Sequence, residues 1–183
     1  MQQSTKGELY IRGRAVRISS THDAVCHKIC FSSSELEENI FANANALQNI
    51  SISSISHSQH LGIVTDSLLK KKVEKYLEII NLNISPTDDI VRNLSRGTQQ
   101  KIVLLRQIFS DNEIFVMDNP LKYLDNPSKV DFYSLMSHLA HKGASILFSS
   151  TDKEELAGIC HRILVLENGR LTDILSPEQI LDI

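Results

Sequence analysis

The sequence has no tryptophan, only four prolines, seven glycines and three cysteines among its 183 residues, and no strong excess of one charge. A formal net charge of −3 gives no general attraction to nucleic acid. No apolar stretch reaches the roughly 20 residues that span a bilayer, and Met1–Lys6 lacks the apolar core of a signal peptide. We therefore expect a cytoplasmic protein with a single domain, because the length suits one sizeable core.

The cysteine count is odd, which fits a reducing compartment better than a set of disulfides. The three cysteines are Cys26, Cys30 and Cys160. Cys26 and Cys30 are spaced as one turn of a helix, with His22 and His27 nearby. A metal site and a buried helix face with free thiols are the two interpretations. We favour the free thiols, because the sequence has no Cys-x₂-Cys pair and no second half of a zinc site.

The first part of the chain predicts a hairpin, a short helix and a strand. Residues 7–18 alternate in polarity about a turn at Gly13, as a β-hairpin does. Ser20 has an aspartate three residues later, which is the pattern of a helix cap, and the helix would continue to Ile29. Residues 29–32 read as a short strand.

The middle of the chain predicts a mobile loop followed by an amphipathic helix. Residues 51–59 are rich in serine and have no periodicity. Two histidines in this loop are poor candidates for metal ligands: His57 and His60. The helix begins at Thr65 or Asp66 and ends before residues 81–86. Its basic run Lys70–Lys72 is expected on a solvated face. Its apolar face consists of Leu69, Val73, Tyr76, Leu77 and Ile80.

From Leu94 onward, helices alternate with apolar strands, which predicts a mostly parallel sheet with helices on its faces. The predicted helices are the one that carries Ile102, Val103, Leu105 and Ile108, and then 128–142 and 152–159. The predicted strands are 114–117, 144–148, 163–166 and 171–175. The last two strands are joined by Asn168-Gly169, a pair that favours a two-residue hairpin turn.

Two motifs carry the strongest functional signal. Asn93–Lys101 (NLSRGTQQK) places a Ser/Gly turn at the start of an amphipathic helix, and Phe115–Pro120 (FVMDNP) ends an apolar strand with Asp118. The start of a helix presents unpaired N–H groups and the positive end of a dipole, so it suits a phosphate. A carboxylate at the end of a buried strand is well placed to hold Mg²⁺, directly or through water.

The order of these motifs resembles the signature motif and Walker B strand of ATP-binding cassette (ABC) ATPases. The resemblance runs from about Gly7 to Leu175 and looks closest to the C-terminal ATPase half of simple-sugar (ribose/galactose-type) or nucleoside importers. The other similar stretches are Gly7–Gly13, Asp23–Val25, Ala46–Ile50, Leu124–Lys129 (the D-loop) and Cys160–Leu166.

The resemblance implies an α/β fold with a P-loop-NTPase-like ABC ATPase core, an N-terminal β-hairpin and a small helical subdomain. Residues 1–183 would form one partial ABC domain. Its parts would be the hairpin and Q-loop region (7–35), the helical subdomain with its serine-rich loop (36–93), and the core with the signature, Walker B, D-loop and switch (94–175).

Five departures from the family concern its chemistry. No Gly-x-x-x-x-Gly-Lys-Ser/Thr (Walker A) motif, which would hold the β- and γ-phosphates, occurs in the sequence. Asn119 stands where the catalytic Glu is usual, and an amide cannot take a proton from water. Arg96 replaces a Gly of the signature. Thr151 stands at the usual position of the switch His, and Ser34 lies near the Q-loop position without being Gln.

The resemblance implies contacts with an ATP bound by a partner, through Ser95, Arg96, Gly97, Gln99 and Asp125. Asp118 would help to hold Mg²⁺ only where a partner supplies Walker A. Each residue also has an ordinary interpretation. Ser95 is a helix cap, Asp118 and Asp125 bond locally, and Arg96 reaches solvent or a neighbouring acid.

We therefore expect a degenerate or truncated ATP-binding subunit or domain of an ABC importer for sugars or nucleosides, inactive as an ATPase alone. It would supply the signature motif to a Walker-A-bearing partner cassette, with ATP and Mg²⁺ in the composite site. Transmembrane permease subunits would hold it at the inner face of the cell membrane. Two alternatives stay open: another chain supplies the Walker A portion, or the chain is a scaffold or regulatory module that binds no nucleotide.

Overall fold

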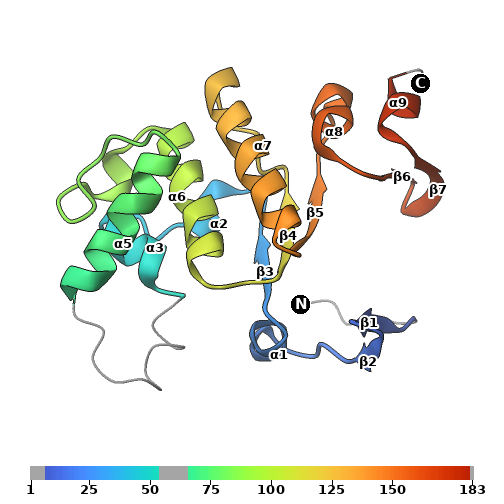
Figure 1. Cartoon of the computed structure of the whole chain (residues 1–183), viewed down its shortest axis with the longest axis horizontal. Helices are drawn as coiled ribbons and strands as arrows, with labels where there is room; N and C mark the ends of the chain where they lie inside the picture. The colour runs from blue at the N-terminus through green and yellow to red at the C-terminus, as the bar shows by residue number, and fades with distance from the viewer. Residues whose placement is uncertain (1–6, 54–65, 182–183) are drawn as a thin grey trace.

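Three parallel strands form the centre of the molecule, in the order β3–β4–β5 (Figure 1). The computed structural model describes residues 7–53 and 66–181. The strands are β3 (Ile29–Ser32), β4 (Ile114–Asp118) and β5 (Ser145–Ser149). Cys30 lies beside Phe115, which lies beside Ile146, so the three strands end at the same edge. The parallel sheet predicted from the alternation of helices and strands is confirmed.

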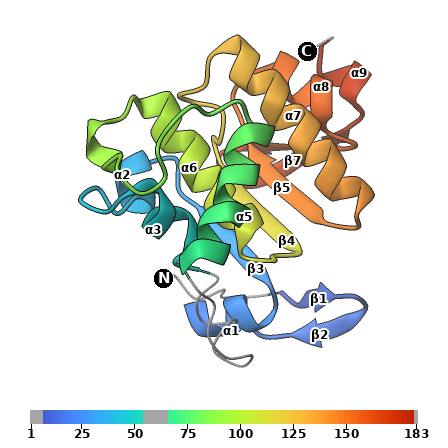
Figure 2. The ribbon, with the colours of Figure 1, turned by 60° about the vertical axis from the view of Figure 1, so that its left-hand side comes forward.

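One face of this sheet is covered by two long helices, α6 (Arg96–Phe109) and α7 (Asn126–His141) (Figure 2). Phe115 and Met117 of β4 point into the contact between the sheet and these helices, and both are almost fully buried. They pack against residues of the helices and of the loop between β4 and α7: Leu104, Leu121, Leu124, Phe132 and Met136. A β-strand alternates its side chains between two faces, so this packing accounts for only one face of the sheet.

The opposite face of the sheet carries an exposed apolar row. Phe31, Val116 and Leu147 are neighbours in register on the three strands. Phe31 is 67% exposed and Leu147 is 56% exposed. In the described part of the chain, β5 also pairs with β4 alone, so its outer edge has no strand beside it. Parallel sheets are usually covered on both faces, so this half of the sheet is incomplete within residues 7–53 and 66–181.

The chain continues from β5 through α8 (Lys153–Ile159) into a hairpin of β6 (Ile163–Glu167) and β7 (Arg170–Leu175) and ends in α9 (Pro177–Ile180). Asn168 and Gly169 have φ values of 49° and 74°, so both residues of the turn are left-handed, as a type I′ hairpin requires. The predicted hairpin is confirmed. It forms a separate two-stranded sheet.

A group of helices with its own core lies beside the sheet: α2 (Leu36–Asn39), α3 (Ala46–Ser51), α5 (Asp66–Ile79) and the 3₁₀ turn η2 (Val91–Asn93). They pack on the outer side of α6 through a second apolar cluster that includes Ile50, Val73 and Ile102. Arg106 of α6 joins this group, because its guanidinium donates to the backbone oxygens of Asn39 and Asn49 at 2.5 and 2.6 Å. Burial lowers the pKa of Arg106 to about 10, so the side chain stays charged at neutral pH.

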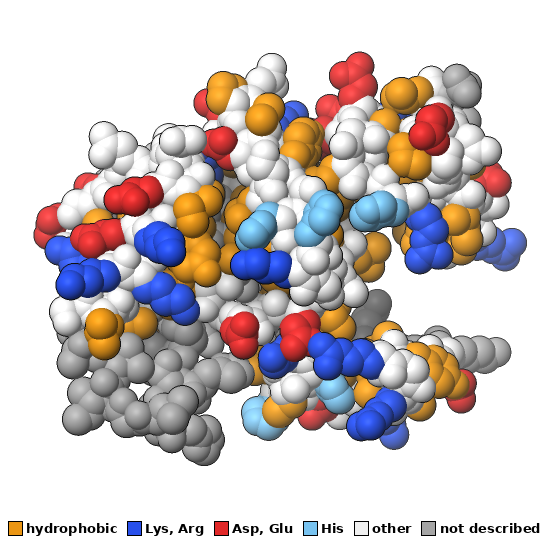
Figure 3. Space-filling model, in the orientation of Figure 1, with side chains coloured by type: hydrophobic (Ala, Val, Ile, Leu, Met, Phe, Trp, Pro, Cys, Tyr) orange, Lys and Arg blue, Asp and Glu red, His pale blue; other side chains and the backbone are white. Residues whose placement is uncertain are grey.

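The N-terminal hairpin of β1 (Leu9–Ile11) and β2 (Arg14–Val16) precedes α1 (Thr21–Cys26). Glu113, just before β4, joins these parts, since it pairs with Arg12 at 2.5 Å and with Lys28 at 2.8 Å. In Figure 3, acidic and basic side chains meet between the hairpin and the sheet.

Some predicted boundaries were wrong for identifiable reasons. The helix after Ser20 ends at Cys26, and Ile29 and Cys30 belong to β3, so Cys26 and Cys30 do not share a helix face. α7 begins two residues before Ser128 because Asp125 is its cap. Ser51 is the last residue of α3. The rest of the predicted serine-rich loop, with His57, His60 and the proposed start at Thr65, lies outside the described residues or at their limit.

Two phenylalanines in neighbouring strands, one on each face of the sheet, test whether the apolar row is exposed in solution. Phe115→Ala should lower the free energy of unfolding by about 3–5 kcal/mol, because it empties a buried site. Phe31→Ala should lower it by less than about 1 kcal/mol, because the ring is mostly exposed. Denaturant unfolding of both variants measures the difference. Equal costs would show that something covers this face when the chain is alone in solution.

Candidate functional site

The candidate site lies at the edge where the parallel strands end. Asp118 is the last residue of β4 and lies beside Ser149, the last residue of β5. Ser34 follows the end of β3 on the other side. In open α/β sheets, ligands bind beyond the carboxyl ends of the strands. The register of three strands therefore collects polar side chains that are far apart in the sequence.

Asp118 is held as a carboxylate. The Ser149 hydroxyl donates to Asp118 Oδ1 at 2.5 Å. This bond is the main reason why the pKa of Asp118 is lowered. The hydroxyl and backbone of Ser34 and the charge of Lys122 lower the pKa of Asp118 further. Because three groups stabilise the anion, Asp118 is ionised at neutral pH.

Asn119 follows Asp118 with a φ of 46°. Its backbone N–H donates to the carbonyl and to the hydroxyl oxygen of Ser149, both at 3.2 Å. The Ser149 hydroxyl therefore accepts from one residue of the pair and donates to the other. Asparagine tolerates this left-handed backbone better than most residues, so its place here also has a conformational reason. Thr151 is exposed, two residues beyond the end of β5.

The start of α6 forms the second part of the site. Ser95 is the N-cap, with its hydroxyl oxygen accepting from the Thr98 N–H at 3.2 Å. The Ser95 side chain is exposed, and Gly97 is half-buried. A Cβ on Gly97 would lie 3.0 Å from the backbone oxygen of Tyr123, so the glycine permits a close approach between the helix and the loop after β4. Ser95 is therefore a helix cap, and its exposed side chain is also accessible to a ligand.

Arg96 and Gln99 are both engaged within the chain. Arg96 Nη2 lies 2.5 Å from Glu37 Oε1, and its guanidinium carbon lies 5.1 Å from the centre of the Tyr123 ring. Gln99 is buried, and its amide nitrogen donates to the backbone oxygens of Val91 and Leu94. The amide nitrogen of Gln99 holds the loop before the helix, and a contact of Gln99 with nucleotide stays a prediction.

Asp125 lies at the start of α7, where it is exposed and accepts from the Ser128 N–H at 3.0 Å. Its pKa is lowered, chiefly by the hydrogen bond with the Ser128 side chain. This is the local capping chemistry that the sequence suggested, and it leaves a negative charge on the surface.

The structure therefore brings Ser34, Asp118 and Asn119 together and places Ser95 and Gly97 on a neighbouring turn. Three further residues of the site were missed in the sequence: Ser149, Tyr123 and Glu37. Ser149 had a signal, since it is the first polar residue after an apolar strand. The other two had none, because their role depends on where α6 packs.

The cysteines and a small apolar cavity are weaker candidates. Burial raises the pKa of the Cys30 thiol to about 12, so Cys30 is not a reactive thiolate. Within residues 7–53 and 66–181, no three His, Cys, Asp or Glu side chains are grouped to hold a metal ion.

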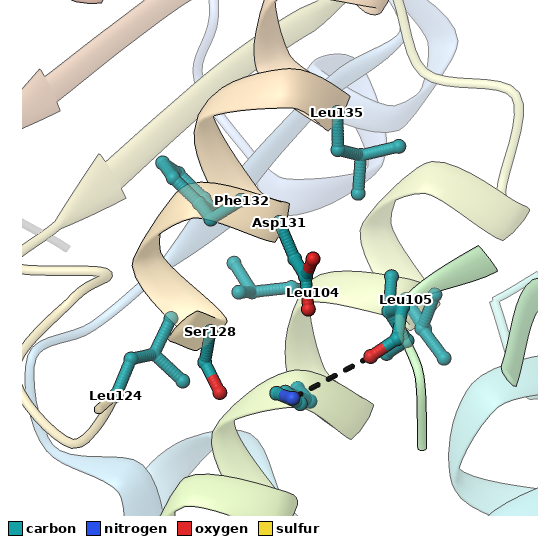
Figure 4. Close-up of a pocket in the computed structure, with 9 residues that line it drawn as sticks. Leu104, Leu105, Leu124, Ser128, Asp131, Phe132 and Leu135 are labelled. Carbon is teal, nitrogen blue, oxygen red and sulfur yellow. Dashed lines mark hydrogen bonds between the residues drawn. The ribbon is translucent and has the colours of Figure 1, made fainter. Parts of the chain in front are cut away.

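Figure 4 shows a cavity between α6 and α7, lined mainly by apolar side chains, with Asp131 and Ser128 among them. Its volume of about 20 Å³ leaves room for about one water molecule. A nucleotide cannot enter it, so the carboxyl edge of the sheet and the start of α6 are the better candidate site.

Comparisons with known proteins bear on the fold and on the family that the chain resembles. The chain is 29% identical over 181 residues (98% of the chain) to the ribose import ATP-binding protein RbsA of Cereibacter sphaeroides. It is 27% identical over 175 residues to the xylose import ATP-binding protein XylG of Thermoanaerobacter pseudethanolicus. It covers 36% and 35% of these proteins, so it spans about a third of their length. No protein-family model matches the chain.

Among solved structures, the ATP-binding cassette MJ0796, as a dimer in a post-hydrolysis state bound to ADP and Pi, superposes with a TM-score of 0.82 at 19% identity. The match covers 96% of this chain and 75% of that cassette. The fold is therefore that of an ABC ATPase, and the resemblance to the ATP-binding proteins of sugar importers is confirmed. No helix in the described part of the chain combines the length and apolar character needed to cross a membrane.

The Ser149 hydroxyl generates a test of the site's electrostatics. Ser149→Ala should raise the pKa of Asp118 toward the ordinary value of about 3.9, because the carboxylate loses its nearest donor. The variant should also be less stable by about 1 kcal/mol at pH 7. A depressed pKa stabilises the fold above the ordinary pKa, so this difference should fade as the pH falls through the folded-state pKa.

Carbon-13 NMR of the Asp118 carboxyl group, titrated between acid and neutral pH, measures the shift. Ser145→Ala, at the opposite end of β5, is the matched control and should leave the titration of Asp118 unchanged. An unchanged pKa in Ser149→Ala would show that the hydroxyl does not bond to Asp118.

Proposed function

We propose that the chain belongs to the ATP-binding component of an ABC importer for sugars or nucleosides. In this proposal, it presents the start of α6 to an ATP whose phosphates are held by a Walker-A-bearing cassette. The observation that carries the proposal is the exposed Ser95 turn, with Gly97 behind it, at the N-terminus of a 14-residue helix. The first backbone N–H groups of a helix have no partners in the helix, and its dipole favours an anion.

The carboxyl edge of the sheet fits Mg²⁺ in one respect, since Asp118 is an ionised carboxylate there. Asp118 would hold the ion directly or through water, with Ser34 and Ser149 keeping it oriented and charged. When bound, Mg²⁺ supplies positive charge that neutralises phosphate oxygens. The sequence contains no Walker A motif, so the phosphates that bring this ion must be held by residues outside it.

Neither of the two residues at the family's usual base and switch positions, Asn119 and Thr151, can serve as a general base. Asn119 follows Asp118 where a carboxylate would be needed, and its amide does not accept a proton from water. Thr151 is exposed and carries a hydroxyl in place of an imidazole. We therefore expect no ATP hydrolysis by the chain alone. Asp125, charged and exposed at the start of α7, would contact the facing cassette.

The uncovered half of the sheet favours a second proposal, which is compatible with the first. A strand and a helix from outside this chain would complete the sheet. The Phe31–Val116–Leu147 row and the outer edge of β5 offer an apolar face and unpaired backbone groups. A further parallel strand would pair with the edge of β5, and the helix that follows it would cover the apolar face. Such a unit, with its phosphate-binding loop, would come from the same polypeptide or from another subunit.

The assembly partners follow from the proposed importer role. Ribose and xylose import proteins are the named relatives, so the proposed cargo is a sugar or a nucleoside. Permease subunits would cross the membrane, and this chain would lie against them on its cytoplasmic side. The net charge of −3 gives no reason to add nucleic acid to these partners.

Substitution of Gly97 tests the composite site. Gly97→Asp places a carboxylate where the phosphate of the partner's ATP would approach. At an effective dielectric near 20, a like charge about 4 Å away costs on the order of 4 kcal/mol. ATP turnover by the reconstituted pair of cassettes should therefore fall by about two to three powers of ten.

Gly97→Ala is the control, because any Cβ here meets the Tyr123 backbone oxygen. Both variants should lose similar stability in thermal unfolding, because both add the same Cβ beside this oxygen. Turnover should fall by less than about tenfold in the alanine variant. If the aspartate variant is no slower than the alanine variant, no phosphate binds there, and the scaffold role remains.

A further inference from the structure

Four charged side chains surround Tyr123 in the loop between β4 and α7. We call this group, with the tyrosine, the Tyr123 cluster; it consists of Glu35, Glu37, Arg96, Lys122 and Tyr123. Arg96 pairs with Glu37 at 2.5 Å and Lys122 pairs with Glu35 at 3.6 Å. Both cations lie over the tyrosine ring, at 5.1 Å for Arg96 and 5.4 Å for Lys122. Cations are attracted to the face of an aromatic ring, so the cluster has two kinds of attraction.

The cluster connects three segments that the sequence keeps far apart. Glu35 and Glu37 belong to the segment 33–39 after β3, which also brings Ser34 to Asp118. Asn39 ties this segment together, since its side chain accepts from the Ser33 N–H and donates to the oxygens of Ser33 and Glu35. Because Glu37 lies between the residues that Asn39 joins, we expect a displacement of Glu37 to move the segment as a unit.

The other two segments are also joined to each other. Gln100 of α6 donates to the backbone oxygen of Pro120 at 2.9 Å, and Gly97 lies against the backbone of Tyr123. The start of α6 and the loop after β4 thus form one packed unit. The segment 33–39 reaches this unit through the charged pairs and through the bonds of Ser34 to Asp118, and it reaches the far end of α6 through the bond of Arg106 to the Asn39 oxygen.

We propose that Arg96 is a positioning residue that couples the segment 33–39, next to Asp118, to the turn of Ser95 and Gly97. The inference rests on the proposed function, because Arg96 stands at a glycine position of the signature motif. It gives Arg96 a regulatory role at the same site. A ligand that draws on Ser34 or Asp118 would change how the start of α6 is presented to the partner's ATP. With a glycine at position 96, Glu37 and Tyr123 would lose this link.

The strength of the link suits a reversible coupling. The side chains of Arg96 and Glu37 are 55% and 60% exposed, and exposed pairs contribute little individually and weaken with salt. The Arg96–Glu37 pair therefore joins the two segments in the free chain, and it is weak enough to break when a ligand binds to either segment.

Charge exchange between the two residues tests the coupling in the chain alone, without nucleotide. Glu37→Arg and Arg96→Glu each place like charges together. Each single variant should speed amide exchange with solvent by about two- to fivefold at both ends of the link. The reporters after β3 are the N–H groups of Ser33 and Glu38, and those at the start of α6 are Thr98 and Gln99. The double variant restores opposite charges and should return all four rates to the parental values.

NMR measurement of amide exchange at low and at high salt gives these rates, and the differences should shrink in about 1 M salt. Arg92→Glu is the matched control, because Arg92 bonds to Asn43 and not to the Tyr123 cluster, so it should leave the reporters of segment 33–39 unchanged. The proposal is overturned if Glu37→Arg leaves Thr98 and Gln99 unchanged, or if the double variant does not restore the rates. Since no nucleotide takes part, this outcome is independent of the turnover measured with Gly97→Asp.

Discussion

The parallel pairing of β4 with β3 and β5 is the constraint on which the rest of the structure depends. The pairing brings the ends of three strands to one edge, where Asp118 meets Ser149 and Ser34. The same pairing turns Phe115 and Met117 toward α6 and α7. Because α6 is fixed on this core, its first turn lies against the loop after β4. The two parts of the candidate site are therefore positioned by one apolar contact between a strand and two helices.

The same alternation of side chains explains the unfinished half of the sheet. A strand that buries Phe115 on one face must present Val116 on the other. On that second face, the neighbours of Val116 are Phe31 and Leu147. Within the described ranges the two outer residues of this row, Phe31 and Leu147, stay exposed, and Val116 is half-buried. A quarter of the matched cassette has no counterpart in the match. Our proposal is that residues outside the described ranges complete the sheet.

Much of this architecture was predictable from the sequence, because apolar periodicity and turn chemistry are local signals. The Asn168-Gly169 turn, the Ser20 cap and the apolar strand that ends at Asp118 were predicted in this way. The helix boundaries near Ile29 and Ser128 were wrong, because a strand pairing and the Asp125 cap decided them. The contact of Arg96 with Tyr123, and the inward turn of Gln99, depend on tertiary packing, so no local pattern predicts them.

The central claim of the account is that this chain offers a signature turn to ATP but does not hold the nucleotide's phosphates itself. Titration calorimetry of the isolated chain with ATP and Mg²⁺ tests this claim most directly. The account predicts a dissociation constant above about 1 mM, which corresponds to less than roughly 4 kcal/mol of binding. Micromolar affinity would contradict the account, because it would require a phosphate-binding loop within these 183 residues.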